Sequence, residues 1–168
     1  MFFWGDYMKE SVEQMLHRLV NLLEEKMIAM ESIQALTLKQ KEDIEENLGD
    51  NINSFIDKKQ VEIDKINTID EKFEDIVKKI KVELGIESLE QIDADRFPQL
   101  KVIRKKTEEI IDLANSIMKL EEYNKNKIIE IIDQIKNDLK TVKLGQKSVK
   151  AYEKPSIDIG GIYIDRKK

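Results

Sequence analysis

The sequence predicts an all-α fold, an elongated antiparallel bundle of three long, coiled-coil-like helices with a flexible C-terminal tail. Three long runs with helical periodicity contain no Gly or Pro, and each ends at a leucine followed by a lone glycine: Gly49, Gly85 and Gly145. Glycine just after such a run commonly ends a helix, because it adopts the left-handed conformation without a Cβ penalty. Charged residues make up 38% of the chain and aromatics only 6%, which is typical of charged helices around an aliphatic core.

The first predicted helix spans residues 11–48, and the second spans residues 51–84. Ser11 and Gln14 match a capping box at the start of the first helix. The second helix carries a seam at alternating spacings of four and three, which indicates left-handed coiled-coil packing. That seam consists of Ile52, Ile56, Lys59, Ile63, Ile66, Asp70, Phe73, Val77, Ile80 and Leu84.

A connector over residues 86–97 precedes the third predicted helix, residues 98–144. Ser88 and Gln91 match a second capping box that opens a short helical turn. Pro98 suits the first position of the long helix, where its missing N–H has no helical partner to lose. We therefore expect residues 1–145 to form the bundle.

The remaining residues, 146–168, lack helical periodicity and contain Pro155, which predicts a flexible tail. Within it, residues 156–165 alternate around Gly160-Gly161 and could form a hairpin. A lone hairpin is marginally stable in water, so it needs a surface to lie on.

Polar residues interrupt the apolar seams of all three helices. They are Lys26, Thr37 and Gln40 in the first helix, Lys59 and Asp70 in the second, and Glu121 and Asn124 in the third. The third helix is also longer than the others by about ten residues, or about 15 Å. Its last part carries Ile128, Ile129, Ile131, Ile132 and Ile135. Either the first helix covers this cluster, or it forms a groove for an amphipathic helix of another protein.

Composition and motifs argue against several classes of function. A net charge of −5 disfavours nucleic-acid binding, which needs clustered Lys and Arg. The chain has no cysteine and no apolar run of about 18 residues, so we expect no disulfide and no membrane insertion. Glu13 and the single histidine, His17, could share a helical face, but a metal site in a bundle needs further ligands. We expect no enzyme, no cofactor and no metal.

The first residues carry four of the ten aromatic side chains, Phe2, Phe3, Trp4 and Tyr7. They lack the early basic residue and the long apolar core of a signal peptide. They could dock on a partner, pack on their own bundle, or be disordered.

Four stretches carry a family resemblance: residues 15–25, 88–100 and 120–129, and a tyrosine after the last helix, Tyr152. The chain resembles the FlgN-type flagellar export chaperones, cytoplasmic proteins of flagellar type III secretion. This resemblance implies binding to the C-terminal segments of hook–filament junction proteins, prevention of their premature assembly, and delivery to the export gate. It places cargo on the last helix and the tail, and gate contact at Tyr152. The implied partner-binding residues are Ile128, Ile131, Ile132, Ile135, Leu139, Val142 and Tyr152.

We expect a monomer or weak dimer. One alternative is a self-associating coiled-coil scaffold, in which Lys59, Asp70 and Asn124 set the register between chains. Another is a flagellar export chaperone that carries filament or cap subunits.

Overall fold

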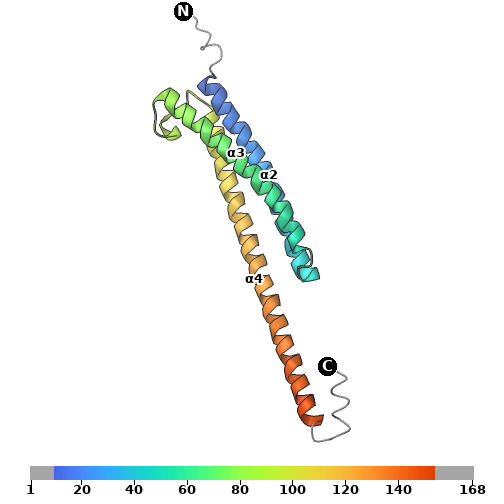
Figure 1. Ribbon diagram of the computed structural model, residues 1–168. Coiled ribbons are helices and arrows are strands. Elements are labelled where there is room, and N and C mark those ends of the chain that lie inside the picture. Colours follow the sequence, from blue (N-terminus) through green and yellow to red (C-terminus); the bar gives the residue numbers. More distant parts are fainter. Residues whose placement is uncertain (1–9, 154–168) are drawn as a thin grey trace, which may run out of the picture. The chain divides into compact units, whose positions relative to one another are not determined.

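The computed structural model describes residues 10–153 and contains three long helices (Figure 1). No strand lies in this part of the chain, and the prediction of an all-α helical bundle is confirmed. The first two long helices start and end within one residue of the predicted bounds. The elements are α2 (Val12–Asn47), α3 (Ile52–Leu84), the 3₁₀ turn η1 (Leu89–Gln91) and α4 (Gln99–Glu153).

Local hydrogen bonds explain where the first two helices begin and end. The Gln14 backbone N–H donates to Ser11 Oγ (3.1 Å), and the Ser11 N–H donates to Gln14 Oε1 (3.0 Å), which completes the predicted capping box. At the end of α3, Gly85 has φ +63°, and the Ile86 N–H donates to the Lys81 carbonyl (3.0 Å). This is the Schellman arrangement that glycine favours. α2 ends at Asn47, two residues before Gly49, because Leu48 itself adopts φ +57°.

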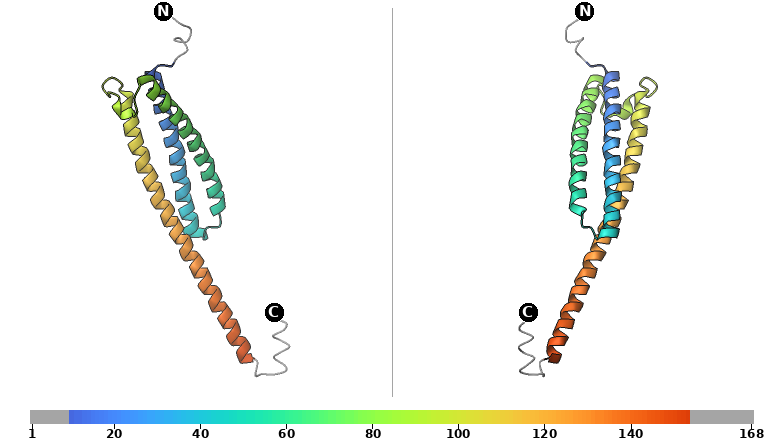
Figure 2. Two further views of the ribbon diagram at one scale, coloured as in Figure 1. Left: turned by 60° about the vertical axis from the view of Figure 1, so that its left-hand side comes forward. Right: turned by 90° about the vertical axis from the view of Figure 1, so that its right-hand side faces the viewer.

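Contacts divide the chain into two units, with the boundary between Asn124 and Lys125. In the first unit, α2, α3 and the N-terminal half of α4 (residues 99–124) lie side by side (Figure 2). Side-chain pairs fix the directions: Lys26 with Asp70 and Gln40 with Lys59 make α2 and α3 antiparallel. Glu13 with Gln99 and Glu24 with Lys106 make α4 parallel to α2. The buried core contains Met15, Leu16, Leu19, Val20, Leu22, Leu23, Met30, Ile69, Ile76, Ile80, Leu100, Ile103 and Ile110.

The buried face of α3 differs from the predicted seam. Ile69 and Ile76 are buried although the seam omits them, whereas Ile56 and Ile63 are exposed although the seam includes them. The reason is that α3 contributes to a core shared with two other helices, which needs a wider and rotated face than a pairwise seam. The sequence period identified the helix and part of its buried face, including Lys59 and Ile80.

The predicted end of the last helix at Leu144 is wrong, because α4 continues through Gly145 to Glu153. A Cβ placed on Gly145 would meet nothing within 4 Å, and its φ is not positive. Glycine inside a helix costs only about 1 kcal/mol relative to alanine, so favourable neighbours can carry the helix past it. Residues 146–153 are therefore helix rather than tail, and α4 has 55 residues. The predicted hairpin at 156–165 lies outside the described residues.

Candidate partner-binding surface

A buried polar layer joins the three helices near the end of the first unit. Lys59 of α3 is only 7% exposed, and its Nζ donates to Gln40 Oε1 of α2 (2.6 Å) and to Glu121 Oε1 of α4. Thr37 Oγ1 of α2 donates to the Ile33 carbonyl (2.7 Å) and contacts the same Glu121 oxygen (3.3 Å). A buried ammonium group is tolerated only with such partners, so the layer fixes the three helices in one register.

Asn124 closes this layer on α4. It is 2% exposed, and its Nδ2 donates to the Thr37 carbonyl (3.2 Å), while its Oδ1 has no hydrogen-bond partner among the described protein atoms. A second polar pair joins α2 and α3, in which Lys26 Nζ lies 2.7 Å from Asp70 Oδ1. The polar interruptions found in the sequence thus pair with one another inside one chain. The sequence identified each residue but could not show which would meet.

Beyond Asn124 the burial pattern of α4 changes. No side chain between residues 125 and 151 is buried within the structure, although aliphatic residues continue at helical spacing. Ile128 and Ile131 are half-buried, and the other predicted partner-binding residues of this stretch are exposed. The exposed fractions are 44% for Ile132, 49% for Ile135, 54% for Leu139 and 55% for Val142.

Val149 extends this surface and was not among the predicted residues. It is 53% exposed and lies seven residues after Val142, which itself lies seven after Ile135. Residues seven apart share one face of a helix. The spacing of seven is present in the sequence, but Val149 was left out because the helix was predicted to end before Gly145. We define the exposed stripe as Ile132, Ile135, Leu139, Val142 and Val149.

The remaining predicted positions are Tyr152 and the aromatic residues near the start of the sequence. Tyr152 belongs to the last turn of α4, and its side chain is not described. The aromatic residues Phe2, Phe3, Trp4 and Tyr7 lie outside the described residues.

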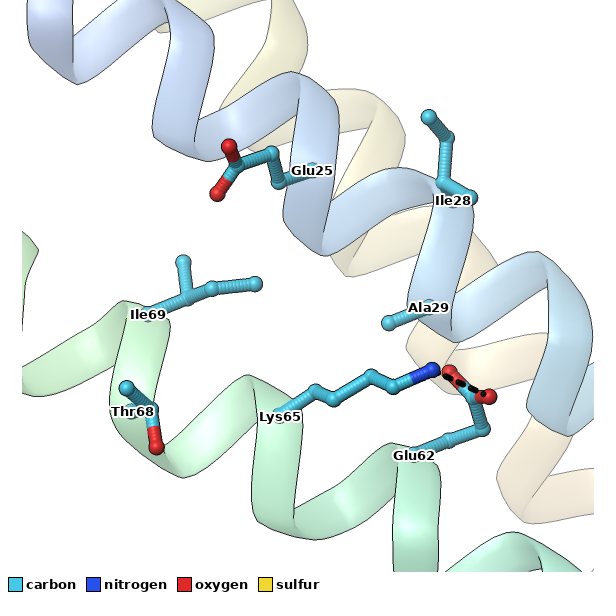
Figure 3. Close-up of a pocket in the computed structure, with 7 residues that line it drawn as sticks. All are labelled: Glu25, Ile28, Ala29, Glu62, Lys65, Thr68 and Ile69. Carbon is cyan, nitrogen blue, oxygen red and sulfur yellow. Dashed lines mark hydrogen bonds and ion pairs between the residues drawn. The ribbon is translucent and has the colours of Figure 1, made fainter.

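Two of the hollows among the described residues lie on the first unit. One has a volume of about 390 Å³ and lies between α2 and α3 (Figure 3). Ile28 and Ala29 line it from α2 and Ile69 from α3, and an ion pair between Lys65 and Glu62 lies at its edge. The residues around it offer few polar groups that converge on one point.

The second hollow, of about 720 Å³, is lined by Glu13, His17 and five neighbours near the start of α2. Among the described residues, no group of three or more His, Asp and Glu side chains could hold a metal ion. Glu13 instead accepts a hydrogen bond from Gln99 Nε2 (3.4 Å).

Comparison with known proteins identifies the family. A model of the FlgN protein family matches residues 15–156 of the 168. The chain belongs to the FlgN family. It is therefore a flagellar export chaperone, whose partners are flagellar export substrates.

Searches of curated proteins and of solved structures gave no significant match. In the described part of this FlgN-family chain, no helix has the length and apolar character needed to cross a membrane.

Proposed function

We propose that this FlgN-family protein is a cytoplasmic chaperone that binds the C-terminal segments of hook–filament junction proteins through the exposed stripe of α4. It would keep these segments from assembling prematurely and deliver them to the export gate. The exposed stripe is the observation that carries this proposal. Contiguous aliphatic side chains that remain exposed on a helix commonly mark a protein-binding surface, and an amphipathic cargo helix can pack along them.

The energetics of this surface suit a cargo that must be released. Completely burying an exposed aliphatic side chain contributes about 1.5–3 kcal/mol. The five stripe residues are each about half exposed, so a partner helix would gain roughly 4–7 kcal/mol from them. Ordering a disordered cargo segment opposes part of this gain. We therefore expect reversible binding.

The polar layer weakens the alternative of a self-associating scaffold. Lys59, Asp70 and Asn124 were the residues that could have set the register between chains, and each has a partner in its own chain. The proposal therefore keeps a monomer or weak dimer. Stable oligomers of the purified protein in sedimentation equilibrium would favour the scaffold instead.

A matched pair of substitutions tests the cargo site. Ile135 belongs to the exposed stripe, whereas Leu144 is 63% exposed and lies on the opposite side of the same helix. Ile135→Asp should weaken calorimetric binding of a junction-protein C-terminal peptide from the same organism at least about tenfold, since one lost apolar contact of about 1.4 kcal/mol suffices. Leu144→Asp should leave binding within about twofold. Equal effects of both variants, or of neither, would place the cargo elsewhere.

Delivery to the gate is assigned to Tyr152 on the family resemblance. Tyr152→Ala should leave the affinity for the cargo peptide unchanged and reduce secretion of junction proteins from cells. A variant that binds cargo normally and supports normal secretion would remove Tyr152 from the gate contact.

A further inference from the structure

A row of lysines follows the exposed stripe along one side of α4. We define the lysine row as Lys136, Lys140, Lys143, Lys147 and Lys150. Each lysine directly follows a residue on the face of the stripe. Four of these preceding residues belong to the stripe, and the fifth, Gln146, is the one polar residue on that face. One residue corresponds to about 100° around a helix, so the row runs beside the stripe from Ile135 to Val149, whereas Asp133 follows Ile132.

The opposite side of the stripe is different. The residues that come directly before the same positions are Gln134, Asp138, Thr141, Gly145 and Ser148, which are small or mostly uncharged. The stripe therefore has one cationic flank and one nearly neutral flank. This asymmetry favours one orientation of a partner helix, with its acidic side toward the lysine flank.

The five lysines are exposed, and none forms an ion pair with the side chains that the structure describes. Three lysines of the first unit, Lys26, Lys59 and Lys106, each pair with a carboxylate of another helix. Contacts within the described chain thus account for these three bundle lysines but not for the row.

The row is also a local reversal of the charge of the molecule. Residues 1–124 contain 18 Lys and Arg against 28 Asp and Glu, a net charge of −10. Residues 125–153 contain seven Lys against four Asp and Glu. Because the rest of the protein is acidic, this positive segment is where electrostatic attraction for an acidic partner is strongest.

We infer that the lysine row recognises acidic side chains along one flank of the amphipathic helix that occupies the exposed stripe. The inference rests on the proposed function, in which that helix belongs to an export substrate. Charged residues beside an apolar seam set partner choice and orientation in paired helices. The stripe thus supplies apolar contact, and the row selects a cargo helix with Asp or Glu on the matching side.

Two other occupants fit the surface less well. An antiparallel pair of two such segments would place one lysine row against the other, which is repulsive. An anionic membrane would attract the lysines, but the stripe contains no Trp or Phe of the kind that anchors interfacial helices. An acidic protein helix satisfies both the aliphatic stripe and its cationic flank.

Two synthetic peptides of about 22 residues test the inference with the full-length protein. Both carry the same Leu and Ile stripe, and one has Glu and the other Lys along one flank. At about 50 mM NaCl the acidic peptide should bind at least about tenfold more tightly, and the preference should fall below about threefold at about 500 mM, because salt screens exposed charges.

Substitutions then assign the preference to the row. The triple variant Lys136→Glu, Lys143→Glu and Lys150→Glu should reverse it, and the same three changes to Arg should keep it. Lys39→Glu, Lys72→Glu and Lys79→Glu form the matched control, since these lysines are exposed on the first unit. That control should keep most of the preference, and circular dichroism should show normal helix content throughout.

Equal binding of the two peptides by the wild-type protein would overturn the inference. Lysine-dependent binding to phosphatidylglycerol vesicles without a peptide preference would assign the row to a membrane surface instead. A junction segment that binds the wild type and the triple Glu variant equally supports the proposed function but overturns the lysine inference. The acidic-peptide preference without any binding of junction segments supports the lysine inference and removes the proposed cargo.

Discussion

The two halves of α4 carry the same aliphatic pattern and use it in opposite ways. Ile103 and Ile110 lie seven residues apart and are each 8% exposed, inside the core shared with α2 and α3. Ile135 and Val142 also lie seven residues apart, and they are 49% and 55% exposed. The comparison shows that helical periodicity specifies an apolar face, whereas tertiary contacts determine whether that face becomes core or remains available.

The polar layer lies where the buried half of α4 ends and the exposed half begins. Glu121 and Asn124 end the buried part of α4 by pairing with Lys59 and Thr37. The same helix thus contributes to stability before this point and, in our proposal, to cargo recognition after it.

The largest expected effect comes from removing the same side chain in each half. Ile110→Ala should lower the free energy of unfolding by about 2–4 kcal/mol, because it leaves a cavity in the core. Ile135→Ala should change it by less than about 0.5 kcal/mol, since the side chain is already half exposed. Urea denaturation followed by circular dichroism measures both. Similar losses for the two variants would mean that the stripe is core.

Breaking the polar layer should have the next largest effect. Glu121→Ala should cost about 2 kcal/mol, because the buried Lys59 loses its carboxylate but keeps Gln40. The double variant Lys59→Met with Glu121→Leu should recover to within about 1 kcal/mol of wild type, since no buried charge remains. Glu122→Ala, at an exposed neighbouring position, is the control. A double variant less stable than Glu121→Ala would contradict this account.

The two glycines should respond to alanine with opposite signs. Gly85→Ala should destabilise the first unit by about 1 kcal/mol, because Gly85 has φ +63°. Gly145→Ala should stabilise its part of α4 by about 0.5–1 kcal/mol, because the site is helical and open. Urea denaturation reports the first, and hydrogen exchange at residues 146–150, slower by about twofold to fivefold, reports the second. A destabilised Gly145→Ala would restore a helix end at this glycine.

Two serines give the smallest contrast. Ser11→Ala should lower stability by about 0.5–1 kcal/mol, because it removes the cap that accepts the Gln14 N–H. Ser148→Ala lies inside the exposed part of α4 and should leave global stability unchanged. Thermal melts of both variants measure the difference. An unchanged melting temperature for Ser11→Ala would show that the capping box contributes little.

Much of the fold could be predicted from the sequence because its signals are local. Ser11, Gly85 and the unbroken helical runs depend only on hydrogen bonds and backbone conformations within a few residues. The spacing of Ile135, Leu139 and Val142 places them on one face of the last helix, since spacing alone defines a face. Whether cargo binds there stays a prediction.

The sequence by itself determined three long helices, the caps at Ser11 and Gly85, and which positions are polar among apolar neighbours. Only the tertiary structure decided which face α3 buries, that Lys59 meets Glu121, and that the helix continues past Gly145 to carry Val149. Caps and periods depend on energies between residues close in the chain. Burial depends on which helices meet, so identical patterns at Ile110 and Ile135 end in different surroundings.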